Sequence, residues 1–270
     1  MAQASGSNEG SRATGMPDRY AQTGGEAVRV LRCGGAGSVV LVCEHASNHI
    51  PPEYGALGLT PQDLERHIAW DPGALAVAER LSERLDAPLV AGLASRLLFD
   101  CNRPFDAPDA IPALSEVFEI PGNRGLDPAA RAERVRRFHD PFRAVLTAAL
   151  DKVRPKVLIT LHSFTPVYRG RPRAVEIGVL HDTDSRLADA MLDLAPAHTQ
   201  ARVARNAPYG PEDGVPHTLR AHALPRGMPN VRLEIRNDLL TTPEAQRGIA
   251  DMLAGWIGAA LLRCDMPVTG

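Results

Sequence analysis

Short apolar runs alternate along this chain with segments of helical periodicity. The apolar runs, rich in β-branched residues, predict buried strands at 39–43, 89–93, 157–161, 176–180 and 231–235. Apolar positions at roughly helical spacing predict helices between them, most clearly at 185–194 and 243–262. Strands separated by helices favour one three-layer α/β/α domain around a mostly parallel, mixed sheet.

Three Asp-Pro pairs mark predicted helix starts or breaks. Asp71-Pro72 and Asp127-Pro128 predict helix starts, because aspartate caps a helix and proline suits its first position. Asp140-Pro141 predicts a break or kink in the second of these helices. The Pro- and Gly-punctuated segment 106–125 predicts a loop.

Two of the predicted strands end in histidine. His45 follows the run 39–43, and His162 follows the run 157–161. Ligands collect at the carboxyl ends of strands in open α/β sheets, so the two imidazoles can converge on one crevice. Neutral imidazole is the commonest zinc ligand, and the pair therefore predicts a metal site.

A catalytic zinc needs a third protein ligand and an open position. Asp71 is the best-placed donor, although a carboxylate before proline is equally typical of a helix cap. Glu44 and His49 are the alternatives. Glu44 is adjacent to His45 on a strand, so alternation should turn its side chain to the opposite face.

A further carboxylate, Glu234, lies near the end of the apolar run 231–235. A buried charge requires a partner, so Glu234 either pairs with Arg232 or Arg236 or performs acid/base work on metal-activated water. The sequence alone leaves both interpretations open.

Arginines near strand ends are candidates for holding a substrate carboxylate, because a guanidinium grips carboxylates through two parallel hydrogen bonds. The candidates are Arg96, Arg103 and Arg169, and Asn102 precedes Arg103 at a turn. His217 and Thr218 belong to a turn-rich loop that could line the same site.

Length, composition and charge indicate the number of domains and exclude some classes of partner. The chain has 270 residues, 44% of them hydrophobic, which is enough for one domain at 26–270. Residues 1–25 have no apolar period and predict a disordered tail without a signal-peptide core. The formal charge of -2 and the lack of an 18-residue apolar run predict no nucleic-acid or membrane partner. Scattered cysteines favour reduced thiols and a cytoplasmic location.

Six ordered motifs between about Val39 and Leu261 together resemble the N-formylglutamate amidohydrolase family. They are Glu44-His45-Ala46-Ser47-Asn48-His49-Ile50-Pro51, Trp70-Asp71-Pro72-Gly73-Ala74, Asn102-Arg103-Pro104, Leu161-His162-Ser163-Phe164, Asp213-Gly214-Val215-Pro216-His217-Thr218-Leu219 and Glu234-Ile235-Arg236-Asn237-Asp238. The resemblance implies a fold like the zinc carboxypeptidases, of the phosphorylase/hydrolase-like type. It also implies His45, Asp71 and His162 as ligands of one zinc per chain and Glu234 as the general base.

The function implied is a zinc-dependent amidohydrolase acting on a small N-acyl amino acid, possibly N-formyl, such as N-formylglutamate. Family members more often have His-Ser-Gly where this chain has His45-Ala46-Ser47, which leaves the acyl group and amino acid open. Alternatives are a carboxypeptidase-like peptidase, a cell-wall amidase, which the missing export signal disfavours, and a non-catalytic binding protein with a degraded metal site. The oligomeric state is not predicted.

Overall fold

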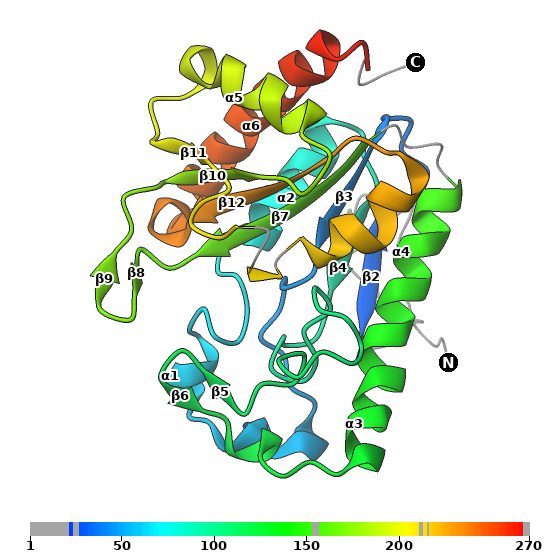
Figure 1. Ribbon diagram of the computed structural model, residues 1–270, viewed down its shortest axis with the longest axis vertical. Helices are drawn as coiled ribbons and strands as arrows, with labels where there is room; N and C mark the ends of the chain where they lie inside the picture. The colour runs from blue at the N-terminus through cyan, green and yellow to red at the C-terminus, as the bar shows by residue number, and fades with distance from the viewer. Residues whose placement is uncertain (1–21, 24–26, 153–156, 211–212, 215, 267–270) are drawn as a thin grey trace, which may run out of the picture.

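An eight-stranded mixed sheet forms the centre of the computed structural model, which describes residues 22–23, 27–152, 157–210, 213–214 and 216–266 (Figure 1). In spatial order, the strands are β1 Gln22–Thr23, β2 Val28–Leu31, β4 Leu89–Gly92, β3 Val39–Cys43, β7 Val157–Phe164, β12 Asn230–Arg236, β10 Ile177–Leu180 and β11 Val203–Arg205. Strands β4, β3, β7 and β12 are parallel neighbours, and β11 is parallel to β10. The pairs β1–β2, β2–β4 and β10–β12 are antiparallel. The predicted mixed α/β sheet is confirmed.

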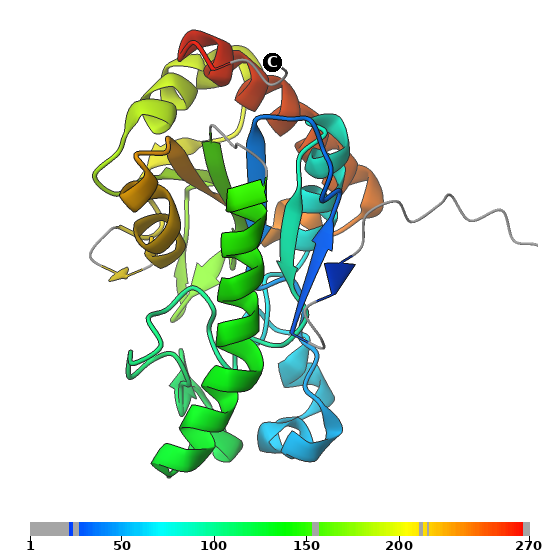
Figure 2. The same cartoon turned by 90° about the vertical axis from the view of Figure 1, so that its right-hand side faces the viewer.

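Helices cover both faces of the sheet. They are α2 Ala74–Arg84, α4 Asp140–Lys152, α5 Arg186–His198 and α6 Pro243–Arg263. The shorter helices α1 Pro61–Leu64 and α3 Pro128–Arg134 lie outside the sheet. One face, which includes Ile159 and Leu233, packs against α2, α5 and α6. The other face, which includes Val42 and Leu158, packs against Phe142 of α4. Figure 2 shows α4 in front of the sheet and the other long helices around its far side.

A smaller lobe lies beside the carboxyl ends of β3 and β7 and contains α1, α3 and the hairpin β5 Leu114–Ser115 with β6 Phe118–Glu119 (Figure 1). Its own apolar core includes Leu57, Leu97 and Phe138. A second hairpin, β8 Val167–Tyr168 with β9 Arg171–Pro172, follows β7. These segments project beyond the sheet edge near His45, which follows β3, and His162, which lies within β7 (Figure 1).

Several helix boundaries differ from the sequence prediction. Helix α2 begins at Ala74 with Gly73 as its cap, so the interpretation of Asp71 as the cap is wrong. Gly73 has φ +80°, and a Cβ there would lie 2.5 Å from Leu240 Cβ, which requires glycine at this turn. Of the break or kink predicted at Asp140-Pro141, the break is wrong, because a π-helical turn at Val135–His139 leads directly into α4. The segment 106–125, predicted as loop, contains β5, β6 and a short turn at Pro121–Asn123.

Other predicted helix starts are confirmed. Asp127 caps α3 by accepting a hydrogen bond from Ala130 N. Helix α6 begins at Pro243, and Thr242 accepts a hydrogen bond from Ala245 N there. Within the predicted tail, Gln22–Thr23 form β1, and residues 1–21 and 24–25 lie outside the described part of the chain. The four cysteines are free thiols. No helix among the described residues is long and apolar enough to cross a membrane.

Candidate active site

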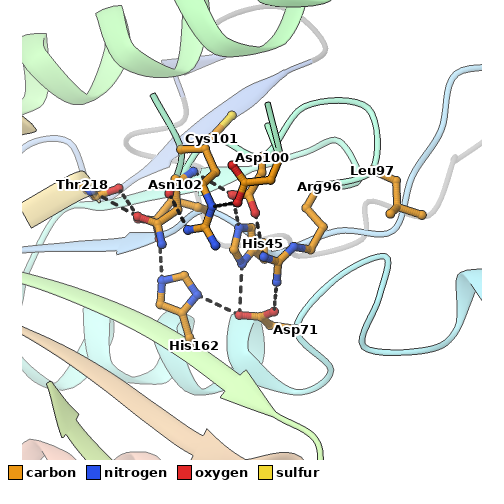
Figure 3. Close-up of polar contacts among 12 residues, drawn as sticks. His45, Asp71, Arg96, Leu97, Asp100, Cys101, Asn102, His162 and Thr218 are labelled. Carbon is orange, nitrogen blue, oxygen red and sulfur yellow. Dashed lines mark hydrogen bonds and ion pairs between the residues drawn. The ribbon is translucent and has the colours of Figure 1, made fainter. Parts of the chain in front are cut away.

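Three buried side chains converge at the carboxyl ends of β3 and β7. His45 Nδ1 lies 3.4 Å and His162 Nδ1 lies 2.8 Å from the same atom, Asp71 Oδ2. One ligand atom from each residue lies within 4.8 Å of the others, as a single metal ion requires. Figure 3 shows both imidazoles turned toward Asp71. The structure thus brings together the three residues that the sequence put forward as metal ligands.

Each imidazole has a second carboxylate close to its other ring nitrogen, Nε2. His45 Nε2 lies 2.7 Å from Asp100 Oδ1, and His162 Nε2 lies 3.1 Å from Glu44 Oε2. Metal-binding histidines generally direct their other ring nitrogen at a carboxylate or carbonyl, which fixes the tautomer and the ring orientation. With both Nδ1 atoms facing Asp71 and a carboxylate close to each Nε2 atom, the donor set fits a metal ion.

The electrostatics of this group keep its carboxylates ionised. Burial opposes ionisation of Glu44, but the attraction of His162 outweighs it and lowers the pKa of Glu44 to about 2. Against the same burial cost, the two histidines hold the pKa of Asp71 well below its usual range. Burial and Arg232 disfavour a charged His162, yet Glu44 and Asp71 raise the pKa of His162 to about 9. A metal that bound His162 Nδ1 would therefore have to displace a proton from His162.

Glu44 does not follow the strand alternation that was expected to turn its side chain away from the face of His45. Strand β3 ends at Cys43, and the chain turns at Glu44 and His45, so the two side chains no longer alternate across a sheet. Gly92 of β4 makes room for this turn, because a Cβ there would lie 2.2 Å from Glu44 O. Glu44 consequently reaches His162 from behind, outside the group of three ligands. His49, the other alternative for the third ligand, is exposed and also outside this group.

Glu234 stands next to His162 in the sheet, since the two residues are paired in the parallel register of β12 and β7. The structure is compatible with both interpretations of Glu234, as the partner of an arginine and as an acid/base group. Its Oε1 accepts hydrogen bonds from Arg232 Nε and Nη2 at 2.8 and 2.5 Å, whereas Arg236 pairs with Glu176 and Asp238. Its Oε2 is buried and has no hydrogen-bond partner among the described residues. One oxygen is therefore anchored and the other is available to a bound molecule.

A cleft of about 650 Å³ opens above this group, with Asp71, Asp100 and Glu234 in its lining. Both hairpins contribute to its walls, and they are joined where Arg169 N donates to Glu116 Oε1 at 2.7 Å. Arg96 and Arg103 line the cleft as well. A cleft of this size suits a small-molecule substrate.

Of the three predicted arginines, Arg169 is exposed in the cleft lining, and the other two have acidic partners. Arg96 Nη2 lies 2.6 Å from Asp100 and its Nη1 lies 3.5 Å from Asp71, so Arg96 bridges two carboxylates of the site (Figure 3). Arg103 Nε lies 2.8 Å from Asp109, and its Nη1 donates to the carbonyl oxygens of Asn102 and Gly214.

The remaining predicted residues do not line the main cleft. Asn102 Oδ1 accepts hydrogen bonds from Thr218 N and Oγ1, both at 3.1 Å, which ties the loop after Asp100 to the loop before the π-helical turn at Leu219–Ala223. His217 and Thr218 line a separate cavity of about 290 Å³, together with His139 and His222. Burial lowers the pKa of His217 and that of His222, the latter to about 4, so both imidazoles are neutral at neutral pH.

Sequence reasoning did not single out Asp100. It is 4% exposed and is held by His45, Arg96 and the backbone N–H of Asn102. A carboxylate directly after the apolar triplet 97–99 was the available signal, because a buried acid implies a specific partner.

Comparisons with known proteins identify the family. A family model described as N-formylglutamate amidohydrolase matches residues 37–241. A gene product of Agrobacterium tumefaciens with a solved crystal structure is 51% identical over 90% of this chain and 97% of its own, with a TM-score of 0.86. The N-formylglutamate amidohydrolase of Ralstonia eutropha JMP134 is 21% identical over 89% of this chain and 97% of its own, and its TM-score of 0.61 reflects a shared fold. No curated protein matches the sequence.

The family model spans well over half of the chain, and its range includes all three members of the buried His-Asp-His group and Glu234. The resemblance drawn from six short motifs is thereby confirmed. This chain belongs to the N-formylglutamate amidohydrolase family and is a hydrolase that acts on amide bonds.

Proposed function

We propose that this protein is a zinc-dependent amidohydrolase that holds one zinc ion per chain and cleaves the amide of an N-acyl amino acid such as N-formylglutamate. The observation that carries the proposal is the buried group of His45, Asp71 and His162 beside Glu234 in an arginine-lined cleft. Family membership favours amide hydrolysis over the alternative of a non-catalytic binding protein.

The donor set supports zinc as the metal. Two imidazole nitrogens and one carboxylate oxygen are zinc ligands, and three protein ligands leave one position open for water and substrate. When bound there, zinc supplies Lewis-acid activation of the scissile carbonyl and of the attacking water.

Glu234 is the proposed general base. Arg232 holds Oε1 from the neighbouring position on the same strand face, and this anchoring fixes the direction of Oε2. Oε2 receives the proton of the attacking water and then delivers it to the nitrogen of the leaving amine. Arg103 remains the arginine proposed from sequence to orient the substrate, while Arg96 serves to position Asp71 and Asp100.

The proposal is tested with a panel of N-formyl and N-acetyl amino acids, a dipeptide and a muramoyl-peptide, each incubated with zinc-loaded and zinc-stripped protein. We expect turnover of an N-acyl amino acid that depends on zinc and returns when zinc is restored. Preferred cleavage of the dipeptide or the muramoyl-peptide would support a peptidase or a cell-wall amidase instead. Binding of the N-acyl amino acids without turnover would contradict the proposal.

A change at Asp100 tests the support behind His45. Asp100→Asn keeps an oxygen acceptor for His45 Nε2 and Asn102 N but removes the negative charge, so we expect zinc affinity to fall by about 10–100-fold. Affinity is measured by competition with a chromophoric chelator. Asp109→Asn is the matched control, because Asp109 also pairs with a cleft arginine but its side chain is 60% exposed and contacts no proposed ligand. Equal zinc affinity in the two variants would show that Asp100 does not support the ligand.

A further inference from the structure

One arginine of the cleft differs from the others in its surroundings. Of the arginines that line the cleft, Arg96, Arg103 and Arg232 each pair with a carboxylate. Arg169 and Arg171 are exposed, whereas Arg173 is partly buried. Arg173 also lines the cleft, but no carboxylate of the described residues pairs with it. Its positive charge is therefore not neutralised by the protein around it.

Aromatic rings surround the Arg173 guanidinium on several sides. Its Cζ lies 4.6 Å from the ring centroid of Tyr168, 4.7 Å from that of Tyr209 and 5.5 Å from that of Phe164. The chain has only four tyrosines, so two of them are committed to this one side chain. Contacts between a cation and aromatic faces hold a guanidinium in place without neutralising its charge.

The hydrogen bonds of Arg173 leave one edge of the guanidinium open. Nη1 donates to Tyr209 Oη at 3.1 Å and to Thr165 O at 3.4 Å. Nε and Nη2 donate to no described residue. These two N–H groups form the fork that binds a carboxylate through two parallel hydrogen bonds.

We infer that Arg173, held by Phe164, Tyr168 and Tyr209, is the receptor for a carboxylate of the substrate and determines the preference of the cleft for an acidic N-acyl amino acid. This inference rests on the proposed function, because it concerns the substrate of the same cleft. It assigns recognition of one substrate carboxylate to an arginine of the segment after the β8–β9 hairpin, in the same cleft as Glu234 and in addition to the orienting role proposed for Arg103.

The test uses three related substrates and the zinc-loaded protein. N-formyl-L-glutamate carries two carboxylates, N-formyl-L-glutamine lacks the side-chain carboxylate, and N-formyl-L-isoglutamine lacks the α-carboxylate. The parent protein should prefer N-formyl-L-glutamate over one of the amides by about 10–100-fold in kcat/KM, the range of a hydrogen-bonded ion pair. The amide that is rejected identifies which carboxylate Arg173 binds.

Arg173→Gln should reduce that preference to within about threefold, mainly through a higher KM for N-formyl-L-glutamate. Arg173→Lys keeps the charge but not the fork, so it should retain part of the preference. Arg171→Gln is the matched control, because Arg171 is exposed, lines the same cleft and lies two residues away. Its preference should stay at the parent value. An Arg173→Gln protein that still discriminates against the amides as the parent does would overturn the inference.

Binding of glutarate separates this inference from the proposed function. Calorimetry with glutarate, with and without zinc, needs no turnover. If the parent hydrolyses no N-acyl amino acid, the proposed function is wrong. The role of Arg173 in binding a carboxylate is then tested by glutarate binding alone. We expect Arg173→Gln to weaken glutarate binding by at least tenfold relative to Arg171→Gln. Equal affinities in the two variants would overturn the assignment of Arg173.

Discussion

Replacing Glu234 with glutamine is expected to lower kcat by on the order of 10²–10⁴-fold while zinc remains bound. Glutamine keeps the size of the side chain and one oxygen acceptor for Arg232, but its amide cannot take a proton from water. The proton acceptor that glutamine lacks is Oε2 of Glu234, which is buried and has no hydrogen-bond partner among the described residues. Turnover of the best N-acyl amino acid and zinc content per chain are measured on the same preparation.

The same substitution weakens an ion pair that is 5% and 1% exposed, so it also destabilises the protein. Removing one partner of a buried pair costs about 3–5 kcal/mol, and the retained amide oxygen should keep the loss of unfolding free energy below that range. Activity is therefore compared at a temperature at which both proteins are folded. Glu176→Gln is the control, because Glu176 pairs with Arg236 of the same strand but does not line the cleft. A folded, zinc-loaded Glu234→Gln protein with turnover within a fewfold of the parent would reject the catalytic role.

The strands and the strand-end residues could be predicted because their signals are local. Buried strands appear as β-branched runs, and His162 and Glu234 interrupt two of these runs at positions that the parallel register then pairs. Asp71 could be proposed only as one of two alternatives, since Asp before Pro is compatible with a cap and with a ligand. Gly73 takes the cap position itself, which excludes the cap interpretation and leaves the ligand role as a proposal.

The residues that surround the proposed ligands could not be predicted, because their positions depend on where strands end and where loops return to the site. The period-two rule placed Glu44 on the wrong side, since the strand stops one residue before it. Asp100 reaches His45 across 55 positions of sequence, and Arg173 meets Tyr209 across 36. The β8–β9 hairpin carries strands of two residues each, too short for any periodicity to reveal.

His162 is the ligand whose loss should have the largest effect on the metal. Its Nδ1 faces the centre of the proposed site, and the side chain is fully buried between Asp71 and Glu44. His162→Ala removes one of three protein ligands and leaves two buried carboxylates without their shared partner. We expect zinc affinity to fall by more than about 100-fold, which exceeds the effect of losing a supporting carboxylate, and activity to fall with zinc occupancy.

Two further variants separate loss of the metal from loss of the fold. His162→Gln keeps a polar side chain that can donate to Asp71 or Glu44, so the protein should remain folded in circular dichroism while still losing zinc. His49→Ala changes a histidine of the same sequence motif that is exposed, and it should retain one zinc per chain. Zinc content is measured by elemental analysis after dialysis against a weak chelator. If folded His162→Gln kept stoichiometric zinc, or if His49→Ala lost it, the metal would have to bind elsewhere than at His45, Asp71 and His162.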